Sequence, residues 1–142
     1  MYEALSLARQ AESAGEVPVG AVLVSEGRVV ARAYNRPVAL NDPTAHAEIL
    51  VMREAGIRIA NYRLLNATLY VTLEPCPMCA GAMVNARLGK LVFACRDLRF
   101  GGVRSKFRIA DSDLLNHQVD VVEGILAAEA AEMLKAFFER RR

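Results

Sequence analysis

The sequence predicts an α/β fold in which helices cover both faces of a mixed five-stranded sheet. Two observations support this prediction: the chain contains five short β-rich runs, and helical stretches separate the second, third and fourth of them. Crossover helices make the later strands parallel, whereas the first two runs follow each other directly and form an antiparallel hairpin. We therefore expect a three-layer α/β/α sandwich. Its 142 residues fit one domain, over residues 1–142.

Apolar spacing and turn residues place the individual elements. Residues 2–14 are predicted as the first helix, because alanine and leucine recur at helical spacing before Gly15. The segment 25–28, Ser-Glu-Gly-Arg, predicts the hairpin turn. Residues 35–44 are expected to form a loop that ends in Asp42-Pro43, a pair that favours a helix start. The predicted strands are 19–24, 29–34, 68–73, 91–95 and 119–122, and the predicted later helices are 45–55, 77–87 and a last one with Ile125, Met133, Leu134, Phe137 and Phe138 on its apolar face.

Composition excludes several classes of protein. Hydrophobic residues make up 54% of the chain and charged residues 24%, which excludes an intrinsically disordered protein and suggests an oligomer. No apolar run approaches the roughly 18 residues of a membrane-spanning helix, because Glu74 interrupts the most apolar region. The first residues lack the pattern of a secretory signal, so we expect a cytoplasmic protein without membrane attachment.

The basic residues are unevenly distributed, although the net charge is only +2. Five of them lie between positions 96 and 108 with a single acid, Asp97, and three arginines end the chain. A solvated loop and a frayed helix end account for any one of these arginines. Two basic clusters beside one site would also suit a polyanionic partner. The clusters are Arg96, Arg99, Arg104, Lys106 and Arg108, and Arg140, Arg141 and Arg142.

Two of the three cysteines are spaced to bind a metal. Cys76 and Cys79 lie three positions apart where a helix is expected to begin, so both sulfurs lie on one face. Free N–H groups at a helix N-terminus favour the thiolate, the form that binds zinc. In a reducing compartment, Cys-X-X-Cys fits either half of a zinc site or a redox pair. His46 is the candidate for a further ligand, whereas His117 lies in a polar stretch typical of an ordinary hydrogen-bonded histidine.

Glu48 is an acid within an otherwise apolar run, and its burial without a partner would be costly. Residues two apart do not share a face of a helix, so His46 and Glu48 converge only if the first turn points into the site. In that case His46, Cys76 and Cys79 supply three zinc ligands and leave a fourth position to water, as in catalytic zinc sites. Glu48 would then carry protons. His-X-Glu followed by Pro-Cys-X-X-Cys is the signature of zinc-dependent deaminases.

With these motifs, the chain resembles the bacterial tRNA-specific adenosine deaminases of the cytidine deaminase-like superfamily. The resemblance covers nearly the whole chain and is carried by residues 16–22, 42–48, 72–76 and 78–83 and by the closing Phe137-Phe138. It implies the cytidine deaminase-like fold, one Zn²⁺ per subunit, a homodimer, and hydrolytic deamination of the wobble adenosine to inosine in a tRNA anticodon stem-loop.

The resemblance also implies two substrate contacts. Asn35 matches an asparagine that hydrogen-bonds the target base, and Asp97 matches an acid that contacts the nucleotide sugar. From the residues alone, Asn35 is a turn residue and Asp97 a partner for nearby arginines. The segment 100–104, Phe-Gly-Gly-Val-Arg, departs from the commoner form of this loop in the family.

Two other functions remain open at this point. The same metal site serves deaminases of a free base or nucleoside, such as cytosine, cytidine or guanine. A noncatalytic zinc-binding module, with its fourth position closed by another group, is a further alternative. The two basic clusters favour the tRNA substrate.

Overall fold

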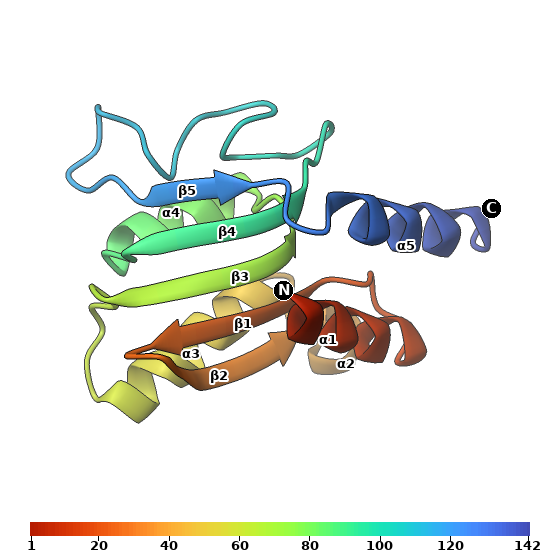
Figure 1. Cartoon of the computed structure of the whole chain (residues 1–142). Coiled ribbons are helices and arrows are strands. Elements are labelled where there is room, and N and C mark those ends of the chain that lie inside the picture. The colour runs from red at the N-terminus through yellow and green to blue at the C-terminus, as the bar shows by residue number, and fades with distance from the viewer.

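A mixed five-stranded sheet forms the centre of the computed structural model, which describes residues 1–142 (Figure 1). The strand order is β2-β1-β3-β4-β5. β1 pairs antiparallel with both β2 and β3, whereas β3, β4 and β5 are parallel to one another. The predicted mixed sheet is therefore confirmed. Its strands are β1 (Gly20–Ser25), β2 (Arg28–Tyr34), β3 (Ala67–Leu73), β4 (Lys90–Cys95) and β5 (Asp120–Glu123).

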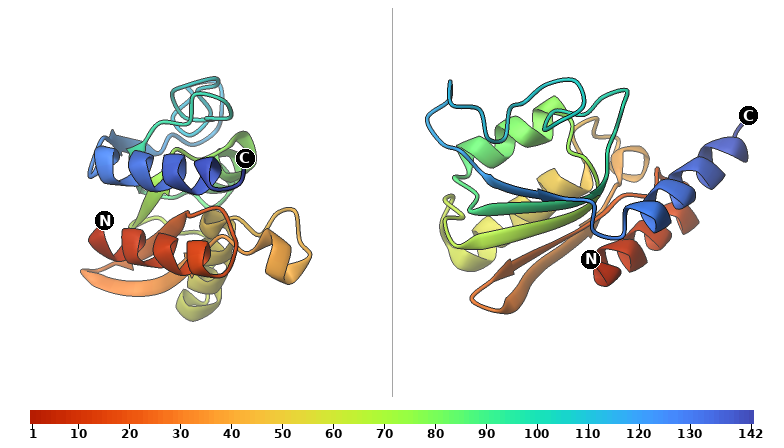
Figure 2. Two further views of the ribbon diagram at one scale, coloured as in Figure 1. Left: turned by 90° about the vertical axis from the view of Figure 1, so that its right-hand side faces the viewer. Right: turned by 45° about the horizontal axis from the view of Figure 1, so that its top comes forward.

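Helices cover the two faces of this sheet, as Figures 1 and 2 show. The first face carries α1 (Tyr2–Ser13) and α5 (Ala127–Glu139), and the opposite face carries α3 (Ala47–Ile59) and α4 (Pro77–Asn85). Side chains of β1 alternate between the layers. Leu23 joins the main core with α3, while Val22 packs with α1. None of the helices is both long and apolar enough to span a membrane.

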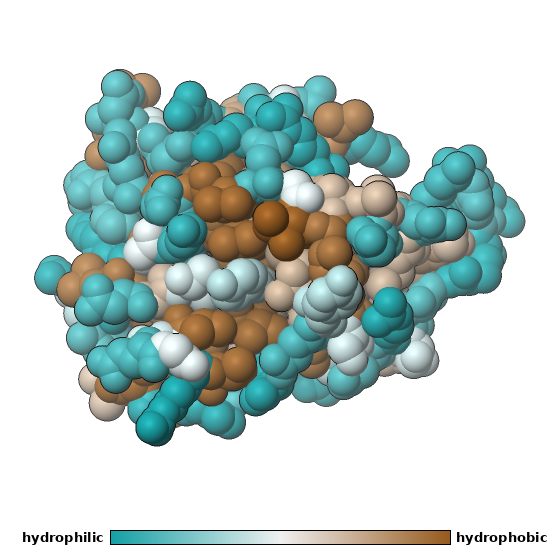
Figure 3. Space-filling view, viewed as in Figure 1, coloured by the Kyte–Doolittle hydropathy of each residue, from teal (hydrophilic) through white to brown (hydrophobic).

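The first face of the sheet is only partly covered. α1 and α5 both lie toward one end of the strands, and apolar side chains gather over the middle of the exposed part (Figure 3). Val24, Val29 and Tyr70 remain partly buried there beside the buried Val22. This face accounts for part of the high apolar content of the chain.

Element boundaries differ from the prediction where single residues adopt left-handed backbone angles. α3 runs on to Ile59 and ends at Ala60, with a φ of 59°. Ile125 lies outside α5, because Leu126 has a φ of 58° and precedes the first helical residue. The hairpin turn agrees with the prediction, since Glu26 and Gly27 both have positive φ.

The segment before α3 also differs from the predicted loop and helix start. A short helix, α2 (Pro37–Leu40), lies within it. The carboxylate of Asp42 accepts hydrogen bonds from the N–H and hydroxyl groups of Thr44 and forms a turn, so Pro43 does not begin the helix. α3 consequently starts at Ala47, two residues later than predicted.

Candidate active site

Two of the predicted ligands occupy the same position in two helices. His46 is the N-cap residue of α3, with φ −71° and ψ 151°, and Cys76 is the N-cap residue of α4, with φ −72° and ψ 172°. An N-cap residue lies just outside its helix, so helical spacing does not restrict its side chain. His46 and Glu48 can therefore face one site, although they are two positions apart. Cys79 follows in the first turn of α4.

The side chains of His46, Cys76 and Cys79 form a group that could hold a metal ion. The Nδ1 atom of His46 lies 3.6 Å from the Cys76 sulfur and 3.5 Å from the Cys79 sulfur. All three candidate ligand atoms lie within 4.8 Å of one another. Tetrahedral zinc, with bonds of about 2.0–2.1 Å to nitrogen and 2.3 Å to sulfur, places such neighbours about 3.6 Å apart. The donor types and their spacing fit zinc.

The charges of this group also suit a cation. Hydrogen bonds from the Cys79 thiol and from His46 lower the pKa of Cys76 to about 4. The hydrogen bond with Cys76, together with burial, raises the pKa of Cys79, and Cys76 likewise raises the pKa of His46. Hydrogen bonds thus connect the three side chains, and a bound metal ion would replace the protons in these bonds.

Glu48 lies in the first turn of α3 and is 4% exposed. Burial raises the pKa of Glu48 to about 7, although its own N–H group and the nearby His46 oppose this effect. Near neutral pH the side chain can therefore both accept and donate a proton. Such a value suits a general acid–base group.

Asn35 connects the end of β2 to the start of α3. Its side-chain oxygen accepts a hydrogen bond of 2.8 Å from the N–H group of Ala47, the residue after His46. Asn35 is 8% exposed, and its side-chain NH₂ group has no hydrogen-bond partner within the protein. This NH₂ group is free to donate to a ligand.

Asp97 lies in the loop after β4. One oxygen of its carboxylate, Oδ1, accepts hydrogen bonds of 3.0 Å from the N–H groups of Arg99 and Phe100. No residue of the chain donates a hydrogen bond to the other oxygen, Oδ2. Asp97 therefore shapes the turn and keeps an acceptor for another molecule.

Two further carboxylates, to which the sequence analysis gave no functional role, are buried. Glu16 is 2% exposed and accepts hydrogen bonds from the N–H groups of Val38 and Ala39, in α2. Glu74 is 1% exposed and accepts hydrogen bonds from the loop after β4. Glu74 directly follows the seven residues of β3, so the reasoning that singled out Glu48, an acid in an apolar run, would also have found it.

His117 and Cys95 lie outside the ligand group. His117 forms a hydrogen bond of 2.7 Å between its Nε2 atom and the carbonyl oxygen of Leu88, as expected for a structural histidine. Cys95 is buried in β4, and burial raises the pKa of its thiol to about 11. The structure therefore leaves Cys95 as a small buried residue.

Most of the clustered arginines have partners within the chain. In the loop cluster, Arg96 and Arg104 pair with Glu123, and Arg104 and Arg108 pair with Asp111. At the end of the chain, Arg140 pairs with Glu12, and Arg141 donates a hydrogen bond to the carbonyl oxygen of Gly15. Arg99, Lys106 and Arg142 form no ion pair within the chain.

Comparison with known proteins identifies the family of this chain. The family model of MafB19-like deaminases matches residues 1–142. A Haemophilus influenzae protein named tRNA-specific adenosine deaminase is 48% identical over 143 residues, which cover 100% of this chain and 83% of that protein. A solved structure from a study of A-to-I editing by tRNA:A34 deaminases has a TM-score of 0.91 and 48% identity, covering 94% of this chain and 97% of the other.

A guanine deaminase from Nitrosomonas europaea is more distantly similar. Its structure has a TM-score of 0.81 and 25% identity, and the match covers 94% of this chain and 80% of the other. The relatives thus share the cytidine deaminase-like fold but differ in their named substrates. The chain belongs to the MafB19-like deaminase family, within the group whose similar members are named tRNA-specific adenosine deaminases.

Proposed function

We propose that this protein converts the wobble adenosine of a tRNA anticodon loop to inosine by hydrolytic deamination, with release of ammonia. One combined observation carries this proposal. A His/Cys/Cys group beside the buried Glu48 lies in a chain that is similar over its full length to tRNA-specific adenosine deaminases.

The metal in this proposal is zinc, one ion per subunit. Nδ1 of His46 and the sulfurs of Cys76 and Cys79 would hold it, because their spacing matches tetrahedral coordination. A zinc ion held there would supply Lewis acidity, which makes water nucleophilic near neutral pH.

Glu48 acts as the general base and then as the general acid of the reaction. Its carboxylate accepts a proton from the attacking water as the oxygen bonds to C6 of adenine. It passes this proton to N1, then takes the proton of the hydroxyl group now on C6 and delivers it to the departing amine, so that the C6–N bond breaks, a C6 carbonyl forms and ammonia leaves. The pKa of about 7 allows Glu48 to act in both directions.

Asn35 and Asp97 position the nucleotide in this account. The free NH₂ group of Asn35 donates a hydrogen bond to an acceptor on the purine ring, while its oxygen remains on the N–H group of Ala47. The Oδ2 atom of Asp97 accepts a hydrogen bond from a sugar hydroxyl, while Oδ1 maintains the turn. Each residue thus has one polar group for the fold and one for the substrate.

An anticodon loop is a suitable substrate because its target base can leave the stack at low cost. Arg99 and Lys106 are exposed in the loop next to Asp97, and neither forms an ion pair. These two cations would contact phosphate groups.

The similarity to a guanine deaminase supports a second candidate, a deaminase of a free base. The deciding experiment measures ammonia release from a synthetic anticodon stem-loop, guanine, cytosine and cytidine. The tRNA proposal expects turnover of the stem-loop. Turnover of only the free bases or nucleosides would contradict it.

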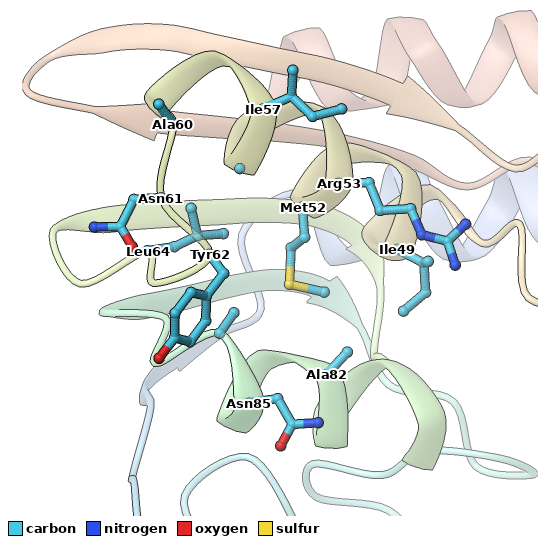
Figure 4. A pocket seen from close by; sticks show the side chains of 12 residues that line it. Ile49, Met52, Arg53, Ile57, Ala60, Asn61, Tyr62, Leu64, Ala82 and Asn85 are labelled. Atoms are coloured by element: carbon cyan, nitrogen blue, oxygen red, sulfur yellow. The ribbon is translucent and has the colours of Figure 1, made fainter.

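A homodimer is part of the same proposal, and an apolar groove between α3 and α4 is the surface that favours it. The groove has a volume of about 710 Å³. Figure 4 shows Ile49 and Met52 of α3 pointing toward Ala82 of α4 across it. At its rim, Ile57 is 81% exposed and Tyr62 is 73% exposed. Apolar side chains this exposed suit a second copy of the chain better than water.

The molecular mass in sedimentation tests this interface. Wild-type protein should have the mass of two chains, and Ile57→Asp should shift the mass toward one chain. A monomeric wild type would contradict the proposed dimer. The ammonia-release experiment tests the proposed reaction independently of this result.

The compartment proposed for this activity is the cytoplasm. tRNA is processed there, and the candidate site contains two free thiols that must stay reduced to bind a metal.

A further inference from the structure

We propose that Glu74 is a positioning residue, whose buried carboxylate holds the backbone of residues 97–105 against the candidate active site. This inference rests on the proposed function, because residues 97–105 carry the proposed substrate residues Asp97 and Arg99. Glu74 itself touches no reacting atom in this account. It acts through the loop.

The carboxylate of Glu74 accepts five hydrogen bonds from this loop. Its Oε1 atom accepts one of 3.1 Å from the N–H group of Asp97 and another from the hydroxyl group of Ser105. Its Oε2 atom accepts bonds of 3.1, 2.8 and 2.9 Å from the N–H groups of Val103, Arg104 and Ser105. One side chain thus fixes both ends of the loop.

No cation neutralises this buried carboxylate. The guanidinium group of Arg104 turns away to Asp111 and Glu123, and only its backbone N–H group faces Glu74. The negative charge is therefore stabilised by backbone dipoles, which need a defined loop conformation. The buried carboxylate therefore favours the loop conformation in which these N–H groups point toward it.

Apolar side chains anchor this loop at only one point. Two of its three large apolar side chains face solvent, since Leu98 is 72% exposed and Phe100 is 63% exposed. Gly101 and Gly102 are buried at its centre. Val103 is the exception, because its side chain is fully buried in the main core. For the rest of residues 97–105, the hydrogen bonds to Glu74 connect the backbone to the end of β3.

Close backbone packing brings the loop to the metal-binding group. A Cβ atom at Gly101 would overlap the Glu74 carboxylate. A Cβ atom at Gly102 would lie 2.7 Å from the Pro77 nitrogen and 2.8 Å from the Cys76 carbonyl carbon. The N–H group of Gly102 also donates a 2.7 Å hydrogen bond to the Pro75 carbonyl oxygen. The absence of side chains at Gly101 and Gly102 thus lets the loop pack directly on the segment that bears Cys76.

Glu74→Gln tests the proposal without a large change of shape. Both carboxylate oxygens accept from N–H or O–H donors, so an amide must turn its own NH₂ group against some of them. We expect faster hydrogen exchange at the amides of 97 and 103–105. At equal zinc content, KM for the stem-loop should rise by about 10- to 100-fold, with a smaller change in kcat.

Three further variants separate positioning from general destabilisation. Val22→Ala, a buried change in β1, should lower the free energy of unfolding and leave loop exchange and KM unchanged. Glu74→Asp retains the charge and should recover part of the KM effect. Gly101→Ala presses on the same carboxylate, so its effect on KM should not add to that of Glu74→Gln. If Glu74→Gln does not fold, Gly101→Ala is tested instead, and it should likewise show faster hydrogen exchange in the loop and a higher KM.

The proposal would be overturned if Glu74→Gln had the hydrogen-exchange rates and the KM of the wild type. Faster hydrogen exchange in the loop with an unchanged KM would also overturn it. An equal change in KM for Val22→Ala would indicate a merely structural role and would also overturn it. If the wild type does not deaminate the stem-loop, the proposed function fails. The exchange comparison then still decides whether Glu74 anchors the loop.

Discussion

Glu48 shows how the surroundings of one residue can set its chemistry. A glutamate in water is ionised at neutral pH, whereas burial in the first turn of α3 raises the pKa of Glu48 to about 7. The same side chain interacts electrostatically with His46, one of the three residues that could hold a metal ion. Its position and its pKa both suit proton transfer.

Replacement of Glu48 by glutamine should separate chemistry from metal binding. Glu48→Gln keeps the shape of the side chain but removes its ability to accept a proton. We expect retained fold and zinc content, with deamination of the stem-loop reduced by at least about 100-fold. Ammonia release and metal analysis on one sample provide the measurement. Glu54→Gln, on the same helix, is the control, and unaltered turnover of Glu48→Gln would refute the assigned role.

Residue type and spacing were enough to select His46, Cys76, Cys79 and Glu48 from the sequence, because thiols, imidazoles and acids in apolar runs are few. The way they meet was not predictable from helical spacing. It depends on His46 being an N-cap residue, which in turn depends on the turn at Asp42 that delays the start of α3.

At the scale of the elements, the loop after β4 has a backbone that is hydrogen-bonded to Glu74 and several side chains that are exposed. Arg99 and Lys106 are its cations without acid partners, whereas Arg104 is held by Asp111 and Glu123. The basic cluster could be read from the sequence. Which of its members are free could not, because the pairing acids lie up to 27 positions away.

Salt dependence tests the role of these cations. Each phosphate contact contributes a slope of about 0.7–0.9 to the dependence of log affinity on log salt concentration. Arg99→Ala and Lys106→Ala should each weaken stem-loop binding and make this dependence shallower. Arg58→Ala, whose side chain pairs with Glu54, should leave the slope unchanged. An equal slope in all four proteins would rule out these phosphate contacts.

Asp111 gives the same loop region a pH-dependent contribution to stability. Burial raises the pKa of Asp111, but hydrogen bonds from Arg104 and Arg108 outweigh it and hold the pKa below the ordinary 3.8. A lowered carboxyl pKa stabilises the fold above pH 3.8, and this contribution is lost as the pH falls through the folded value.

Asp111→Asn should therefore lower the free energy of unfolding by about 1 kcal/mol near neutral pH. The difference from wild type should shrink below pH 3.8. Urea unfolding across this range measures it, with Asp120→Asn at an exposed site as the control. A difference that is independent of pH would contradict the ion-pair explanation.

At the scale of the whole molecule, alternation of strands and helices predicted the mixed sheet correctly. The exact ends of α3 and α5 were not predictable, because they depend on left-handed angles at Ala60 and Leu126 that tertiary packing stabilises. The substrate is a further property that the fold alone does not determine. A guanine deaminase and a tRNA:A34 deaminase both superpose on this chain.

The central claim is that metal-dependent deamination of a wobble adenosine occurs at His46, Cys76 and Cys79. The most direct measurement is inosine formation in an anticodon stem-loop as zinc is removed by a chelator and then returned. We expect activity to disappear with the metal and to recover in proportion to added zinc, up to about one ion per chain. Full inosine formation by the zinc-free protein would contradict the claim.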